Sequence, residues 1–113
     1  MSSYDSLIST LQQNGVFRTR RIIDAFKTIR RDNFLPLDAT NRAGEDIPLP
    51  IGHNQTNSQP TTVAFMLELL EPLPGQRILD VGSGSGWTTG LLSFVVGEQG
   101  SVYGTERIPE LVE

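Results

Sequence analysis

The feature that most constrains the fold of this chain is a stretch of three alternating glycines, Asp-Val-Gly-Ser-Gly-Ser-Gly, at residues 80–86. It directly follows the strand-like run Arg77–Leu79, and the apolar segment behind it predicts a helix from about Trp87. Glycine adopts positive φ and lets the backbone approach a ligand without an intervening Cβ. The unpaired N–H groups at the start of the following helix attract polar groups.

A second strand-like run, Ser101–Thr105, ends at Glu106, twenty residues beyond Gly86. A carboxylate at this spacing is placed to accept hydrogen bonds from two ribose hydroxyls. Strand, glycine loop, helix and second strand together predict the first βαβ unit of a parallel, nucleotide-binding sheet.

The composition narrows the class of protein. The 113 residues correspond to one small domain, and nine basic against thirteen acidic side chains argue against a nucleic-acid-binding module. There is no cysteine, so we expect neither disulfides nor a thiolate metal site. No apolar run is long enough for a membrane helix, and the N-terminus lacks the pattern of a signal peptide. We therefore expect a cytoplasmic protein that uses no metal and binds neither nucleic acid nor membrane.

Apolar spacing predicts three helices before the glycine loop. The first covers residues 4–14, the second follows Thr19 as N-cap and ends near Asp32, and the third begins at Pro60. The third helix has a stripe that we expect to face the core, formed by Val63, Met66, Leu67 and Leu70. Residues 37–57 are rich in Pro, Gly, Asn and Asp and predict a long irregular loop. After the glycine loop we expect a helix over 87–96, with Trp87 in the core, and a further helix from Pro109.

The glycine spacing bears on which nucleotide is bound. The dinucleotide fingerprint G-x-G-x-x-G would place glycine or alanine where this chain has Trp87. The pattern Asp80-x-Gly82-x-Gly84-x-Gly86 instead resembles motif I of S-adenosylmethionine-dependent methyltransferases. That cofactor has no pyrophosphate and carries a sulfonium cation, so a carboxylate at Asp80 is tolerated. A dinucleotide loop and a glycine-rich turn without ligand remain the alternatives.

The segment Leu49–Pro60, Leu-Pro-Ile-Gly-His-Asn-Gln-Thr-Asn-Ser-Gln-Pro, resembles the signature ahead of motif I in the protein-L-isoaspartate O-methyltransferases. In that family Leu-Pro-Ile-Gly leads into Gln-Thr-x-Ser-Gln/Ala-Pro and an apolar helix, and the resemblance extends over nearly the whole chain. There are two departures. Asn54 stands where the family usually has glycine, and Asn57 stands where it usually has an aliphatic residue.

The resemblance implies transfer of a methyl group from S-adenosylmethionine to the free carboxylate of L-isoaspartyl residues in damaged proteins. That carboxylate is ionised at neutral pH, so the reaction needs alignment more than a general base. We expect Ser58 to orient it, with Thr56 and Gln59 on the same substrate-side loop; the alternative for Ser58 is a helix cap. His53 is interpreted as a loop residue. The expected cofactor-binding residues are Asp80, Gly82, Ser83, Gly84, Gly86 and Glu106, with loop positioning or helix-dipole complementation as the alternatives for Asp80.

The expected fold class is α/β: a Rossmann-like, doubly wound methyltransferase sheet of which only the N-terminal helices and the first βαβ unit are present. Residues 1–57 would form the N-terminal helices and substrate-side loop, and residues 58–113 the first part of the cofactor-binding domain. The chain would be part of a longer enzyme, a truncated homologue, or completed by another copy through its exposed sheet edges. The functional alternatives are a non-catalytic cofactor-binding or interaction remnant, and a methyltransferase of the same fold with another carboxylate acceptor.

Overall fold

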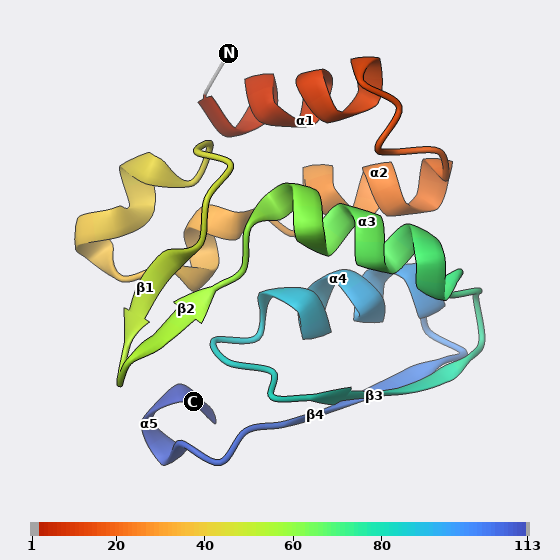
Figure 1. The fold of residues 1–113 in the computed structure, drawn as a ribbon. Coiled ribbons are helices and arrows are strands. Elements are labelled where there is room, and N and C mark those ends of the chain that lie inside the picture. The colour runs from red at the N-terminus through yellow and green to blue at the C-terminus, as the bar shows by residue number, and fades with distance from the viewer. Residues whose placement is uncertain (1–2, 113) are drawn as a thin grey trace.

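The computed structural model describes residues 3–112 and consists of stacked helices over a two-stranded parallel sheet (Figure 1). The helices are α1 (Ser3–Gln13), α2 (Arg20–Thr28), α3 (Pro60–Leu70), α4 (Trp87–Val96) and α5 (Pro109–Val112). The strands are β1 (Leu49–Gly52), β2 (Gln55–Asn57), β3 (Arg77–Val81) and β4 (Ser101–Thr105). Two 3-10 helices lie between α2 and β1, η1 (Arg31–Phe34) and η2 (Leu37–Arg42). No helix within residues 3–112 has the length and apolar character needed to cross a membrane.

The βαβ unit predicted from the glycine loop is present. Strands β3 and β4 pair in parallel, with Arg77 opposite Ser101 and Val81 opposite Thr105. Helix α4 connects them and lies between the sheet and the N-terminal helices α1, α2 and α3 (Figure 1). Its buried side chains are Trp87, Leu91, Leu92, Val95 and Val96. The prediction of a helix over 87–96 and of a strand over 101–105 is confirmed, and the two strands with α4 form a parallel βαβ unit.

The hydrophobic core is built mainly from α1, α2 and α4. Three aromatic rings meet edge to face at its centre: the ring centroids of Phe17 and Phe26 lie 4.8 Å apart, and those of Phe26 and Trp87 lie 5.4 Å apart. The predicted core position of Trp87 is therefore confirmed. The second helix ends at Thr28, earlier than the sequence predicts, because the chain then turns so that the Arg31 side chain enters the interior.

The segment 37–57, predicted to be an irregular loop, is ordered as η2 and a β-hairpin. Strands β1 and β2 pair antiparallel, with Leu49 opposite Asn57. The two residues at the tip, His53 and Asn54, both have positive φ, of 55° and 58°. Consecutive left-handed residues match the twist of a tight hairpin, and asparagine is among the side chains that tolerate them best. The short strands and their prolines explain why the pattern did not indicate a hairpin.

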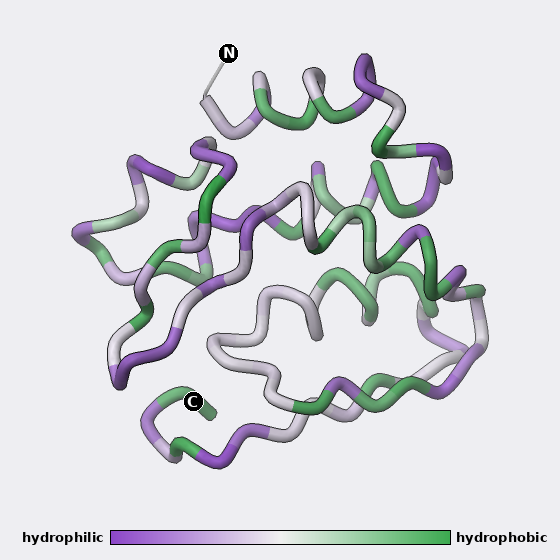
Figure 2. Tube along the Cα trace, in the orientation of Figure 1, coloured by the Kyte–Doolittle hydropathy of each residue, from purple (hydrophilic) through white to green (hydrophobic). Residues whose placement is uncertain are grey.

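The apolar stripe predicted for α3 is only half correct. Val63 and Leu67 are buried, but Met66 and Leu70 are 60% and 54% exposed. The buried face is instead completed by Ala64 and by the carboxylate-bearing Glu68. Glu68 takes a buried position because its side chain binds the start of α2. Most of α3 is apolar in sequence (Figure 2), and its exposed apolar side chains are Phe65, Met66, Leu69 and Leu70.

Glu68 caps α2 from a distance in sequence. Its Oε2 accepts the N–H groups of Arg18 and Thr19 at 2.8 and 2.9 Å, and its Oε1 accepts the Thr19 hydroxyl at 2.6 Å. Thr19 is the N-cap residue as predicted, but its own side chain makes no capping bond. Burial alone would raise the pKa of Glu68, and these hydrogen bonds together lower it below its ordinary value.

Replacing Glu68 by glutamine should destabilise the protein by about 1.5 kcal/mol, because the amide cannot accept all three hydrogen bonds. Since the folded-state pKa lies below the unfolded one, this stabilisation exists above about pH 4.3 and is lost as the pH falls through the lowered folded-state pKa. Urea unfolding of both proteins across this pH range would check the prediction. A difference between them that stays constant into acid would contradict it.

Candidate functional site

The glycine loop between β3 and α4 leaves its backbone open on one side. Gly82 and Gly84 have φ of 72° and 58°, in the left-handed region where other residues are strained. A Cβ placed on Gly82 would meet no atom within 4 Å. The N–H of Ser83 donates to the carbonyl of Thr105 at 2.8 Å, which holds the loop against the end of β4. A group bound here could lie directly on the backbone at Gly82.

Glu106 lies just beyond β4 and contacts the same loop. Its Oε1 accepts the N–H of Gly84 at 2.9 Å, and its Oε2 accepts the N–H of Ile108 at 3.0 Å. The N–H groups of Ile108 and Gly84 hold the pKa of Glu106 below its ordinary value, so the carboxylate is ionised at neutral pH. Each oxygen keeps lone pairs for a further donor.

Asp80, at the end of β3, accepts a hydrogen bond from the Thr89 hydroxyl at 2.7 Å. Thr89 lies in the first turn of α4, so this hydrogen bond connects β3 with α4, the two elements that flank the glycine loop. The contact accords with a loop-positioning role, while direct participation of Asp80 in cofactor binding stays a prediction.

Two adjoining cavities lie between the glycine loop and the β1–β2 hairpin. The larger, of about 460 Å³, is lined by Gln55, Thr56, Val81, Gly82, Gly84, Thr105, Glu106 and Arg107. The smaller, of about 60 Å³, is lined by Thr56, Asn57, Ser58, Asp80, Gly82, Ser83, Gly84, Ser85, Trp87 and Thr88. The two cavities share Thr56, Gly82 and Gly84, so segments that are distant in sequence meet at the glycine loop.

Most of the residues selected from the sequence meet at these cavities. Thr56 and Ser58 face the glycine loop from the hairpin side, with Glu106 on the other side. Gly86 lines a separate cavity of about 220 Å³ with Glu106, and Gln59 lines none of the three. Gln59 is the N-cap residue of α3, and its own side chain makes no capping bond. The N–H of Thr61 in the first turn instead donates to Asp46 Oδ1 at 2.9 Å, so the side chain that caps α3 is Asp46 and not Ser58. His53 is exposed at the hairpin tip.

Arg31 is the residue near the site that sequence reasoning missed. Its side chain is fully buried, and Nε donates to the Asn57 Oδ1 at 2.7 Å. Nη1 and Nη2 donate at 2.6–3.3 Å to backbone carbonyls before β1 and at the end of β2, those of Ala43, Glu45, Ile47, Asn57 and Ser58. Asn57, one of the two departures from the family signature, is thus buried as the partner of a guanidinium.

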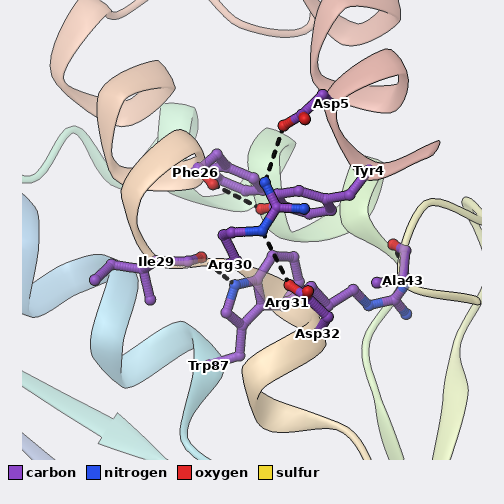
Figure 3. A network of polar contacts seen from close by, with 9 residues as sticks. All are labelled: Tyr4, Asp5, Phe26, Ile29, Arg30, Arg31, Asp32, Ala43 and Trp87. Carbon is purple, nitrogen blue, oxygen red and sulfur yellow. Dashed lines mark hydrogen bonds and ion pairs between the residues drawn. The ribbon is translucent and has the colours of Figure 1, made fainter. Parts of the chain in front are cut away.

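The buried cation also contacts the helix behind the glycine loop. The Arg31 Cζ lies 5.7 Å from the centroid of the Trp87 ring, and Trp87 Nε1 donates to the carbonyl of Ile29 at 2.9 Å (Figure 3). Burial lowers the pKa of Arg31 to about 10, which still leaves it charged at neutral pH. The neighbouring Arg30 points the other way, toward Asp5 and Asp32 (Figure 3).

Within residues 3–112 no three His, Asp or Glu side chains gather as metal ligands. The strand, glycine loop and helix, with an acid after the next strand, define a nucleotide-binding unit of the Rossmann-like methyltransferase class. Residues 2–113 match the family model described as protein-L-isoaspartate(D-aspartate) O-methyltransferase. The chain belongs to this family, which confirms the resemblance noted in the sequence.

Curated relatives carry the name protein-L-isoaspartate O-methyltransferase. The protein from Aeropyrum pernix is 46% identical over 107 residues, which are 95% of this chain and 41% of the relative. The protein from Fervidobacterium nodosum is also 46% identical, over 95% of this chain and 53% of the relative. The chain spans about half the length of the curated relatives it matches.

Solved structures agree with the fold. A Plasmodium falciparum protein described as a protein-L-isoaspartate O-methyltransferase, in complex with S-adenosyl-L-homocysteine, superposes with a TM-score of 0.86 at 27% identity. The similarity covers 99% of this chain and 52% of that one. A second structure, named protein-L-isoaspartate O-methyltransferase, gives a TM-score of 0.80 at 32% identity and covers 96% of this chain and 35% of that one.

Proposed function

We propose that this chain forms the donor-binding and acceptor-orienting part of a protein-L-isoaspartate O-methyltransferase. The reaction transfers a methyl group from S-adenosylmethionine to the free carboxylate of L-isoaspartyl residues in damaged proteins. The observation that carries the proposal is the pair of adjoining cavities at the glycine loop: Thr56 lines both, Glu106 lines the larger, and Ser58 lines the smaller. We also propose a cytoplasmic location, where ageing cellular proteins would supply the substrate.

The residues of the site fit the proposed cofactor. The open space at Gly82 allows a ligand to approach the backbone, and the ionised Glu106 can accept hydrogen bonds from two sugar hydroxyls. The side of the loop would be formed by Gly84, Gly86, Ser83 and Asp80. When bound, S-adenosylmethionine supplies an electrophilic methyl group on a sulfonium, and the acidic side chains around the loop are compatible with that positive charge.

The acceptor side needs orientation rather than proton removal. An isoaspartyl carboxylate is ionised at neutral pH and is itself the nucleophile. The exposed Ser58 can donate its hydroxyl proton to one carboxylate oxygen and leave the other free to react. Thr56 would form the adjoining wall, and Gln59, which begins α3, would contribute less directly. Holding the acceptor in line with the methyl group is the contribution expected of this side.

The decisive experiment combines binding and turnover. Calorimetry with S-adenosylhomocysteine tests the donor site, and transfer of a labelled methyl group to an isoaspartyl peptide, with its aspartyl isomer as control, tests the reaction. Binding together with base-labile label on the isoaspartyl peptide alone supports the proposal. Label only on another carboxylate acceptor would indicate a different methyltransferase, and no binding by the folded chain would overturn the proposal.

A second candidate is a non-catalytic function, in which the open backbone at Gly82 and the Glu106 carboxylate bind the cofactor and no methyl group is transferred. This non-catalytic function predicts heat on addition of S-adenosylhomocysteine and no methyl transfer at any enzyme concentration.

Replacing Ser58 by alanine should lower kcat for the isoaspartyl peptide about tenfold, because one hydrogen bond to the acceptor carboxylate is lost. The dissociation constant for S-adenosylhomocysteine should change less than about twofold, since the hydroxyl lies on the hairpin side of the site. Thr62→Ala, on the exposed surface of α3, is the matched control. Undiminished turnover in the Ser58 variant would remove this residue from the mechanism.

We further propose self-association through the exposed edges of the parallel sheet, which border an open apolar face. On the face opposite α4, Leu79, Val81 and Tyr103 are 61%, 75% and 58% exposed. An open apolar sheet with free edges favours pairing with another chain. Light scattering after size exclusion should show a mass that rises with concentration, and Leu79→Glu should reduce it more than Leu37→Glu. A monomer at every concentration would contradict the prediction.

A further inference from the structure

The feature that neither the fold nor the proposed reaction yet explains is the arrangement around Arg31. A guanidinium has five N–H donors, and here each nitrogen contacts an oxygen of the segment 43–58. Nη2 donates to the carbonyl of Ser58 itself at 3.2 Å and to that of Asn57 at 3.3 Å. The backbone that carries the Ser58 hydroxyl is therefore bound directly to a buried cation.

The same cation lies against the opposite side of the site. Its Cζ is 5.7 Å from the centroid of Trp87, the residue that follows Gly86 and begins α4. Trp87 also lines the smaller cavity together with Ser58. One side chain thus connects the hairpin side of the site with the helix behind the glycine loop.

We propose that Arg31 is a positioning residue that fixes Ser58 at the distance from the glycine loop which methyl transfer requires. This inference rests on the proposed function and deepens it. Arg31 does not reach the cavity, and it acts through the backbone of Ser58 and the ring of Trp87. The Asn57 amide adds to the arrangement: since Nε is a donor, the atom facing it must be the oxygen, and this bond orients the guanidinium plane.

A lysine could not replace this geometry. The ammonium group of lysine has three donors on a flexible side chain. Unlike the coplanar donors of a guanidinium, they cannot reach all the carbonyls that Arg31 binds between residues 43 and 58. Arg31→Lys therefore keeps the positive charge and removes the planar set of five N–H donors. The loosened backbone should let the Ser58 hydroxyl leave its position while the donor side remains intact.

A double-mutant cycle separates positioning from a merely structural effect. Arg31→Lys should lower kcat for the isoaspartyl peptide about tenfold in the wild-type chain, but less than about twofold in a Ser58→Ala background, because the group it positions is already absent. The dissociation constant for S-adenosylhomocysteine should stay within about twofold in all four proteins. Arg30→Lys, the same change at the neighbouring residue, should leave kcat unchanged. Equal losses of kcat in both backgrounds would overturn the proposal.

A second measurement keeps this inference separable from the proposed function. If the wild-type chain transfers no methyl group, the catalytic proposal fails, and amide hydrogen exchange then decides the role of Arg31. Arg31→Lys should accelerate exchange at least tenfold over residues 47–58 and leave α1 and α4 close to wild type, as expected for a local opening. Uniform acceleration across the chain, or none in 47–58, would overturn the positioning role.

Discussion

Replacing Arg31 by methionine is expected to lower the free energy of unfolding by about 3–5 kcal/mol, because several buried acceptors lose their donor and each costs about 1–3 kcal/mol. The side chain is fully buried, and its loss would leave the Asn57 Oδ1 and several backbone carbonyls without donors. Unsatisfied buried acceptors retain their full desolvation cost. Urea unfolding followed by circular dichroism would measure the change.

The neighbouring residue provides the control. Arg30→Met removes two ion pairs and a contact of the guanidinium with the Tyr4 ring at 4.8 Å. Because the Arg30 side chain is 30% exposed and its partners Asp5 and Asp32 are 44% and 33% exposed, the expected loss is about 1–2 kcal/mol. The two variants make the same substitution at adjacent positions. They differ in how deeply the replaced arginine side chain is buried. Similar losses in both would show that the arrangement around Arg31 contributes less than its burial indicates.

Replacing Glu106 by alanine is expected to weaken S-adenosylhomocysteine binding about 30-fold, within the range of a lost charged hydrogen-bond partner. The carboxylate is the group proposed to accept the sugar hydroxyls, and it also holds the N–H of Gly84. Because its pKa lies below the ordinary value, wild-type affinity should be independent of pH from neutrality down to about pH 5 and fall at more acid pH. Calorimetry over this pH range measures both effects.

Glu98→Ala is the matched control for Glu106, since it removes the same charge from an exposed position beyond α4. Its affinity should remain within about twofold of wild type. If both variants weakened binding equally, net charge rather than a specific contact would explain the loss. Unchanged affinity in Glu106→Ala would remove this residue from the donor site.

The βαβ unit could be predicted because its signals are local. The alternating glycines and the apolar runs around them define strand, loop and helix within residues 77–105, and the structure has the elements there. The hairpin could not be predicted in this way. Its strands are short, and its tip uses His53 and Asn54 in place of the glycine-containing pairs that usually indicate such a turn.

The roles of Arg31 and Glu68 depend on long-range contacts, which no local pattern records. Arg30 and Arg31 are adjacent and chemically identical, yet Arg30 is only partly buried and Arg31 is fully buried. The one signal in the sequence was Asn57, which is polar at a position where the family usually has an aliphatic residue. This departure indicated an unusual contact, but it did not identify Arg31 as the partner. Likewise the stripe on α3 was misassigned because a carboxylate, Glu68, occupies the buried face.

Trp87 is the only tryptophan of the chain, and it is buried directly behind the glycine loop and beside the Arg31 cation. Excitation at the long-wavelength edge of the protein absorption band therefore excites a single indole, which lies where the two sides of the site meet. Its emission colour and intensity report the local electric field of the guanidinium. The protein thus contains an intrinsic fluorophore with which loop movements and ligand arrival can be followed without an attached dye.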